Sequence, residues 1–276
     1  MKIDEASIRA IEIVVKTLAK EGIDCVIVGA LVPSILVLHG LADDLTNRIR
    51  PTRDIDTAIS VDSWEQFKRA RVSLIGSGFN KIGSSENKLK YGLVEVDLVP
   101  AGQLMSESGM AGSNAQKQLL NMLSFQETLA NAEVIELSPG LEVKVAPLWA
   151  FAMLKIMAFA DRKQAHDAND IFVVLDSYES ATGRRFDAPA GTVFTVAGAY
   201  ICGEDTSSHV SSGLKDGLIG ILDKHLENGE YAEIISCALR EMKVLESEEE
   251  QMRLYELLKA YRNGMLSTET GGSYSI

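Results

Sequence analysis

The chain has 276 residues, enough for one large or two modest domains with a substantial buried core. Its hydrophobic content of 46% and charged content of 24% are ordinary globular values, which exclude disordered, collagen-like and low-complexity proteins. The formal net charge of −12 arises mainly in residues 176–276, which hold 17 acidic and 9 basic side chains. Long-range attraction of nucleic acid to the whole molecule is therefore not expected, although a local basic groove in the first half could bind phosphate.

The sequence also predicts the cellular location of the protein. The longest apolar stretch, residues 25–38, is interrupted by Pro33 and falls short of the ~20 residues that a membrane-spanning helix needs. Asp4, Glu5 and Glu12 stand where a secretory signal has a basic start and an apolar block. Three widely spaced cysteines favour reduced thiols over a disulfide framework or a zinc site. We therefore expect a cytoplasmic protein that does not contact membranes.

The first sixty residues predict a helix, a strand, a glycine turn and a second helix. Apolar residues at steps of three and four predict a helix over 3–20. The β-branched run that follows predicts a buried strand over 23–29, and a helix is expected over 30–39. Residues 40–53 are polar without an apolar period, as is typical of an exposed loop. Alternation of apolar and polar residues then predicts a strand over 54–61.

The rest of the chain divides into a strand-rich part and a helical part. After a helix over 62–75, short strands are predicted over 79–82, 89–93, 94–99, 134–137 and 141–145. Helices are then predicted over 147–162, 167–178, 214–227, 231–245 and 248–261, with a mixed pattern between 183 and 213. We expect an α/β (α+β) chain with a small mixed sheet and flanking helices in residues 1–130. A mainly helical domain is expected over residues 131–276.

Three aspartates carry the most informative spacing in the sequence. Asp54 and Asp56 lie two residues apart on one predicted strand, so their carboxylates project from the same face. Asp97 lies on another predicted strand, within VEVDLVP. Any one of them alone is more typical of a surface acid or a turn. If the two strands pair, the three carboxylates converge on one or two Mg²⁺ ions, an arrangement that supports phosphoryl transfer.

Phosphate-binding groups are also present in the first half of the chain. Gly29 and Ala30 join a predicted strand to a helix, a geometry in which free backbone N–H groups hold phosphate. Such a turn needs glycine for other reasons too, so the feature is weak by itself. Arg48, Arg50 and Arg53 form the most basic local cluster. They are expected either to be solvated in a loop or to contact the phosphates of an acceptor.

Two further pairs of charged residues lie on the helices after residue 147. Lys155 and Arg162 are seven residues apart and share a helical face that could neutralise a triphosphate, or they could be solvated at the edge of a core helix. Asp167 and Asp170 are three residues apart. They could orient Arg162 or Lys155, contact a ribose, accept a proton from the attacking hydroxyl, or simply complement a helix dipole.

These residues together resemble a known superfamily. The order Gly29-Ala30, then Thr52-Arg53-Asp54-Ile55-Asp56, then Asp97 resembles the nucleotidyltransferases that share their catalytic domain with DNA polymerase β. The sequence from Leu154 to Arg162 is similar to the K-L-x-A-x-x-x-R motif, and 167–170 to the DxxD motif, of AbiEii-type nucleotidyltransferases. These are the toxin components of type IV toxin–antitoxin systems. The resemblance covers about residues 23–178 and departs from the family at Ala30, where Gly or Ser is usual.

The resemblance implies a function and a set of site residues. The chain is expected to transfer a nucleoside monophosphate from an NTP to an acceptor hydroxyl with Mg²⁺ as cofactor. Asp54, Asp56 and Asp97 would be the catalytic and metal-binding residues. The helical domain would complete the active site, with the nucleotide-binding residues being Gly29, Ala30, Lys155, Arg162, Asp167 and Asp170. The acceptor would be tRNA or another RNA, and a cognate antitoxin protein would be a partner.

Two alternatives stay open at the level of the sequence. A small-molecule acceptor, as in the antibiotic-modifying nucleotidyltransferases, fits the low basic charge equally well. A degenerate nucleotide-binding protein without catalysis is the other, because Ala30 lacks the hydroxyl that the family usually offers to phosphate.

Overall fold

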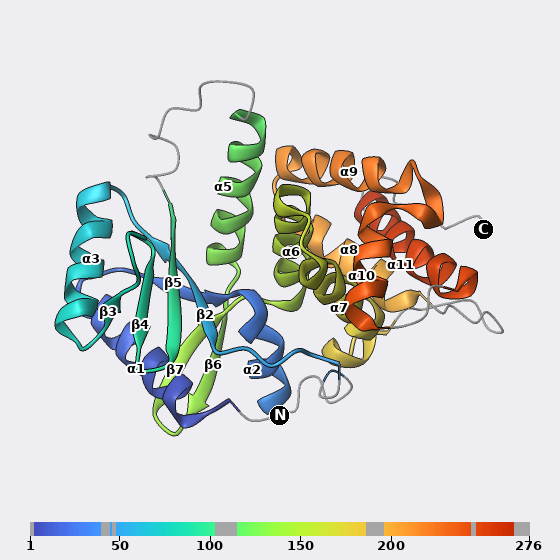
Figure 1. Cartoon of the computed structure of the whole chain (residues 1–276). Helices are drawn as coiled ribbons and strands as arrows, with labels where there is room; N and C mark the ends of the chain where they lie inside the picture. Colours follow the sequence, from blue (N-terminus) through green and yellow to red (C-terminus); the bar gives the residue numbers. More distant parts are fainter. Residues whose placement is uncertain are drawn as a thin grey trace. The chain divides into compact units, whose positions relative to one another are not determined.

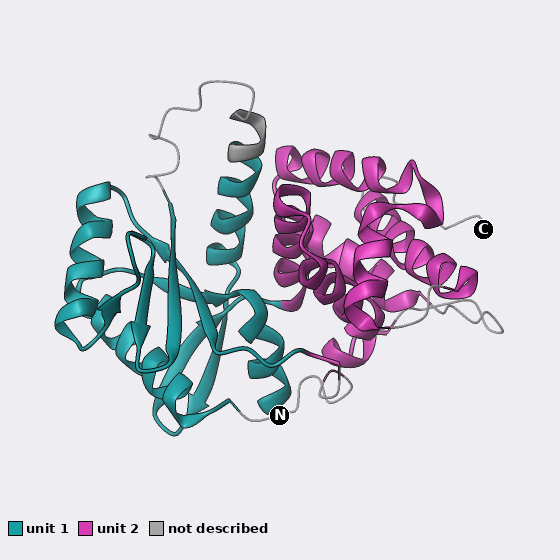
Figure 2. Ribbon diagram, viewed as in Figure 1, with its two compact units in different colours: residues 1–39, 50–147 teal, residues 40–49, 148–276 magenta. Residues whose placement is uncertain are grey.

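The structure is a computed structural model that describes residues 3–39, 45, 48–102, 115–185, 196–243 and 247–267. The chain forms two compact units, shown in different colours in Figure 2. The first unit comprises Met1–His39 and Arg50–Pro147, and the second comprises Gly40–Ile49 and Leu148–Ile276. Within the described ranges, no helix is long and apolar enough to cross a membrane.

The first unit is built on a mixed seven-stranded sheet with the order β3-β4-β5-β2-β1-β7-β6, which confirms the predicted fold class (Figure 1). Its strands are β1 (Cys25–Val28), β2 (Asp54–Ser60), β3 (Asn80–Lys81), β4 (Lys88–Tyr91), β5 (Val94–Ala101), β6 (Glu133–Ser138) and β7 (Leu141–Val145). Two neighbouring pairs are parallel, β2 with β5 and β1 with β7. The other neighbours in the sheet are antiparallel.

Helices accompany this sheet, and a side-chain cap marks the start of two of them. They are α1 (Glu5–Lys20), the short 3₁₀ turn η1 (Gly29–Leu31) with α2 (Val32–Leu38), α3 (Trp64–Gly76) and α5 (Ala115–Ala130). The side chain of Asp4 accepts a hydrogen bond of 2.7 Å from the Ser7 backbone N–H, and Ser63 caps α3 in the same way. Such caps satisfy N–H groups that have no partner inside the helix, so they fix where α1 and α3 begin.

The second unit is helical, as the sequence predicts. It contains α6 (Leu148–Arg162), α7 (Ala165–Thr182), α8 (Ala197–His209), α9 (Ser212–Leu226), the 3₁₀ turn η3 (Gly229–Tyr231), α10 (Glu233–Met242) and α11 (Glu248–Ser267). The boundary differs from the predicted one at residue 130, because β7 pairs with β1 and brings the β6–β7 hairpin into the sheet. Of the predicted loop over 40–53, residues 40–44, 46 and 47 lie outside the described part.

The sequence did not predict the helices α5 and α8. For α8 the reason is visible in its surroundings. Its sequence, AGAYICGEDTSSH, has no apolar stripe because the helix is buried on several sides. A Cβ atom built on Gly203 of α8 would lie 2.0 Å from the carbonyl oxygen of Tyr261 in α11. The reciprocal contact is equally close, since a Cβ atom on Gly264 would lie 2.0 Å from the carbonyl oxygen of Tyr200. The backbones of α8 and α11 are therefore in direct contact at two glycines.

A buried histidine in the second unit makes its stability depend on pH. The ring of His225 lies 5.4 Å from the ring of Phe159, and burial, with help from the charge of Lys163, lowers the pKa of His225 to about 4. The unfolded chain takes up this proton near pH 6.5, whereas the folded chain does not until pH falls to about 4. Folding is therefore progressively disfavoured as pH falls through this window.

We expect His225 to lower the free energy of unfolding by about 2 kcal/mol between pH 7 and pH 5, a value that follows from the shifted pKa. Urea unfolding of the wild type and of His225→Gln, followed by circular dichroism at both pH values, measures it. The variant should lose less stability than the wild type on acidification. Equal losses in the two proteins would contradict the assignment.

Candidate active site

The pairing of β2 with β5 places the three predicted aspartates on one face of the sheet. The strands are parallel, and the register sets Asp56 opposite Asp97 and Asp54 opposite Glu95. Residues that face each other in a ladder project to the same side, and so do residues two apart on one strand. Asp54, Asp56 and Asp97 therefore share one face, while Ile55 and the other residues between them point to the opposite side, where Ile55 is buried.

The same face carries charged residues that the sequence prediction missed. Glu95 is exposed beside Asp54, and the neighbouring strand β4 sets Lys88 opposite Asp97 and Lys90 opposite Glu95. Their signal in the sequence was the alternation in KLKYGLVEVD, which puts both lysines and both acids on one side of a hairpin. We name the group Asp54, Asp56, Glu95 and Asp97 the carboxylate face.

Gly29 is held directly against the carboxylate face. Its φ angle is +71°, in the left-handed region that favours glycine. A Cβ atom at this position would lie 1.9 Å from Oδ2 of Asp56 and 2.7 Å from its Cγ. The turn between β1 and α2 can thus approach Asp56 only because residue 29 has no side chain. The structure brings the predicted glycine turn and the predicted aspartates together.

Ala30 follows Gly29 in the η1 turn and is 7% exposed. Its methyl group lies in the core of the first unit, where a tight turn leaves room for only a small side chain. The assignment of the Gly29 and Ala30 amides to phosphate binding stays a prediction.

The environment of Asp97 disfavours its ionised form. Burial raises the pKa of Asp97, and the charges of Asp54 and Glu95 raise it further, while Lys88 opposes them. Lys88 Nζ lies 3.8 Å from Oδ2 of Asp97, and the Asp97 side chain is 31% exposed. A carboxyl group with a raised pKa is suited to accept a proton, and the catalytic role of Asp97 stays a prediction.

Replacing Asp97 by asparagine is expected to leave the protein equally stable or more stable at pH 7. The raised pKa means that folding disfavours the charged side chain at any pH above its folded pKa, and Asn carries no charge. Urea unfolding with EDTA present, at pH 7 and pH 4, measures the difference between the two proteins. That difference should shrink at pH 4, where Asp97 is increasingly protonated in both states. A variant clearly less stable than the wild type at pH 7 would show that Asp97 is held by favourable contacts.

The carboxylate face offers the kind of donors that Mg²⁺ requires. Hard cations bind carboxylate oxygens, and Asp54, Asp56 and Asp97 supply them from one face beside a turn that carries no side chain. Across the described part of the chain, no three carboxylate, imidazole or thiol side chains are already gathered as a metal-binding group. The residues thus fit the cation by donor type and by register, and their role as metal ligands stays a prediction.

The four charged residues predicted on the helices of the second unit form one network. Lys155 Nζ lies 3.1 Å from Oδ1 of Asp167 and 2.6 Å from Oδ2 of Asp170. Arg162 donates two hydrogen bonds to Asp167, of 2.6 and 2.9 Å. Several roles were predicted for these two aspartates. Their contacts agree with the role in which they orient Lys155 and Arg162.

Burial makes this network energetically important. The side chains of Lys155 and Asp167 are 7% and 0% exposed, whereas that of Arg162 is 54% exposed. Burial by itself raises the pKa of Asp167, but hydrogen bonds from Arg162 and the charge of Lys155 outweigh it and hold the pKa below its usual value. Removing one partner of a buried ion pair typically costs about 3–5 kcal/mol. Loss of either buried partner should therefore weaken the packing of α6 on α7 within the second unit.

Two of the three arginines predicted as a basic cluster have acidic partners in different units. Arg48 binds Asp176 at 2.7 Å and Ser177 at 2.9 Å within the second unit. Arg53 pairs with Asp4 at 3.1 Å in the first unit. The contact of these arginines with acceptor phosphates stays a prediction.

The chain was also compared with known proteins. No protein-family model matches it, and no curated protein matches its sequence.

Proposed function

We propose that this protein is a cytoplasmic, Mg²⁺-dependent nucleotidyltransferase that transfers a nucleoside monophosphate from an NTP to an acceptor hydroxyl. The observation that carries the proposal is the register of β2 against β5, which puts Asp54, Asp56 and Asp97 on one face, with Gly29 against Asp56. Like charges on neighbouring strands repel each other, and Lys88 and Lys90 offset this repulsion only on the β4 side of the face, opposite Asp97 and Glu95.

In the proposed reaction, the acceptor oxygen forms a bond to the α-phosphorus of the NTP. The bond from that phosphorus to the oxygen bridging the α- and β-phosphates breaks, and pyrophosphate leaves with the electron pair. The acceptor hydroxyl loses its proton to a carboxylate, for which Asp97 is the best candidate because burial raises its pKa. Mg²⁺ held by Asp54, Asp56 and Asp97 would supply positive charge that stabilises the phosphates in the transition state.

The phosphates themselves need donors. We assign the backbone N–H groups of Gly29 and Ala30 to this role. Phosphate binding by Lys155 and Arg162, whose positions Asp167 and Asp170 fix, stays a prediction. Arg162 is the better probe of phosphate binding, since its side chain is half exposed and Lys155 is buried. Substituting Lys155 would mix an effect on binding with a loss of stability.

The proposed acceptor is RNA, with the 3′ end of tRNA as the first candidate and a cognate antitoxin protein as a partner. This choice rests on the resemblance to AbiEii-type toxins. A small-molecule acceptor is kept as the second candidate because the net charge of −12 offers RNA little long-range attraction.

The test uses the purified full chain with each α-labelled NTP and Mg²⁺, against total RNA and, separately, a panel of aminoglycosides. We expect label in the tRNA fraction, equimolar release of pyrophosphate, and loss of both with EDTA. Label in an aminoglycoside instead would select the small-molecule reading. Nucleotide binding without any pyrophosphate release from either panel would contradict the proposed reaction and favour a binding protein without catalysis.

A further inference from the structure

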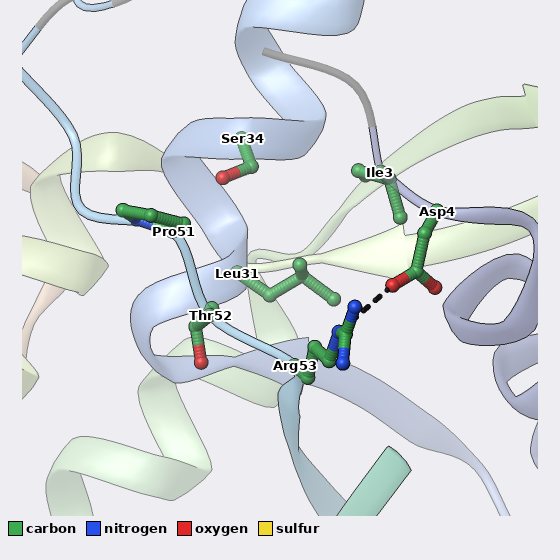
Figure 3. A pocket seen from close by; sticks show the side chains of 7 residues that line it. All are labelled: Ile3, Asp4, Leu31, Ser34, Pro51, Thr52 and Arg53. Atoms are coloured by element: carbon green, nitrogen blue, oxygen red, sulfur yellow. Dashed lines mark hydrogen bonds and ion pairs between the residues drawn. The ribbon is translucent and has the colours of Figure 1, made fainter. Parts of the chain in front are cut away.

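A pocket of about 350 Å³ lies in the first unit and is lined by none of the four residues of the carboxylate face (Figure 3). Its wall comes from three segments, namely the residues before α1, the η1–α2 helical stretch, and the residues before β2. The lining residues are Ile3, Asp4, Leu31, Ser34, Pro51, Thr52 and Arg53. Its volume lies in the range of small-molecule sites.

Ser34 closes the pocket on the side of α2. The residue is only 5% exposed, and its hydroxyl has no hydrogen-bond partner among the residues that the structure describes. Figure 3 shows the hydroxyl directed from α2 toward the side of the pocket that carries Pro51. Because this oxygen is itself enclosed, Ser34 contributes shape to the pocket wall, and the polar contacts to a ligand come from the other lining residues.

The charged groups of the pocket balance each other. Arg53 Nε donates to Oδ2 of Asp4 at 3.1 Å, and the two side chains are 63% and 41% exposed. Because Asp4 already offsets the charge of Arg53, the lining residues that the structure describes leave no spare cation for a phosphate. The pair instead offers a planar donor and a carboxylate acceptor to an uncharged ligand with hydrogen-bonding edges.

The remaining lining residues suit a flat, partly apolar molecule. Ile3, Leu31 and Pro51 give apolar contact, and the guanidinium plane of Arg53 can stack on an aromatic ring. Thr52 accepts a hydrogen bond of 3.0 Å from the Asp54 backbone N–H, which leaves the proton of its hydroxyl to donate to another group. A heterocyclic base with an attached sugar has this combination of a flat apolar face, polar edges and hydroxyl groups.

The pocket is linked to the carboxylate face at two points. Thr52 in its wall is bonded to Asp54 at the start of β2. Leu31 in its wall belongs to the η1 turn, whose first residue, Gly29, contacts Asp56. A molecule in the pocket therefore lies next to the segments that position two of the proposed metal ligands.

We propose that this pocket binds the nucleoside moiety, base and sugar, of a substrate. The inference rests on the proposed function for its meaning, and it goes further by naming a binding site and the chemical class it accepts. The charge balance among the described lining residues suits the nucleoside, with the phosphates outside the pocket.

Saturation-transfer difference NMR of the full chain with each ribonucleoside, and separately with tripolyphosphate, tests the proposal. At least one nucleoside should bind the wild type, and Ser34→Leu, which fills the pocket, should weaken that binding at least tenfold. Arg53→Gln, at an exposed position that folding tolerates, should weaken it about threefold or more. The matched control is Arg9→Gln, because Arg9 is an exposed arginine that pairs with Glu12 on α1, and it should bind as the wild type does.

Two results would overturn the proposal. One is that no ribonucleoside binds, and the other is that Arg53→Gln and a folded Ser34→Leu bind it as well as Arg9→Gln does. Repeating the measurement with Asp56→Asn separates this inference from the proposed function, since nucleoside binding should persist in a protein that transfers nothing. The same variants show whether the pocket holds the nucleoside of the NTP or that of the acceptor. If Arg53→Gln binds NTP more weakly, the pocket holds the nucleoside of the NTP. If NTP binding is unchanged and the KM for the acceptor is raised, the pocket holds the nucleoside of the acceptor.

Discussion

Replacing Asp56 by asparagine is expected to lower the rate of nucleotidyl transfer by about 10³-fold, equivalent to ~4 kcal/mol of transition-state stabilisation. Asp56 is the central residue of the carboxylate face, because it lies opposite Asp97 in the β2–β5 ladder and against Gly29 in the turn. Asparagine keeps the shape of the side chain and removes its charge, so the variant should fold. Single-turnover label transfer and thermal unfolding of the same preparations measure both effects.

The matched control for this variant is Asp62→Asn. Asp62 is an exposed acid in the same unit, beyond the opposite end of β2. It should retain full activity, so that any loss in Asp56→Asn cannot be ascribed to the change of net charge. Transfer by Asp56→Asn at the wild-type rate would remove the carboxylate face from the mechanism.

Replacing Gly264 by alanine is expected to destabilise the second unit by about 3 kcal/mol or more, which lowers Tm by roughly 6–12 °C. The new Cβ atom would lie 2.0 Å from the carbonyl oxygen of Tyr200, and a backbone atom has no rotamer that could move it away. The helices α8 and α11 must therefore separate, which opens the packing around Gly203 as well. Thermal unfolding monitored by circular dichroism at 222 nm measures the change.

Gly220→Ala is the control for the cost of changing a helical glycine. Gly220 lies in α9, and a Cβ atom there would meet nothing within 4 Å. This variant should be more stable by about 0.5–1 kcal/mol, because alanine favours helix more than glycine does. The two substitutions should change the free energy of unfolding in opposite directions. If Gly264→Ala were as stable as Gly220→Ala, α8 and α11 would adjust easily to the added methyl group.

The sequence was most informative where local periodicity and pairing agree. Alternation in the stretches around Asp56 and Asp97 predicted two strands correctly, and the mixed sheet with flanking helices is confirmed. The sequence could not predict the parallel register of β2 and β5, because a long stretch of chain from residue 61 to residue 93 separates the two strands. Glu95 was missed for the same reason, since its place opposite Asp54 depends on that register.

Other features depend on contacts that no local pattern encodes. The helix α8 was missed because burial on several sides leaves it without an apolar stripe, and its glycines are explained only by α11. The spacing of Lys155 and Arg162 was visible, but their pairing with Asp167 depends on how α6 packs against α7. The predicted roles of these residues in nucleotide binding, and of the aspartates in metal binding, stay predictions.

The route of the chain has a consequence for dissecting this protein. Residues 40–49 belong with the helices, so the polypeptide passes from one unit to the other three times, after His39, Ile49 and Pro147. A fragment cut at Pro147 would carry Arg48 away from Asp176. Neither unit can thus be produced as one uninterrupted stretch of polypeptide, so its properties have to be probed by substitutions in the full chain.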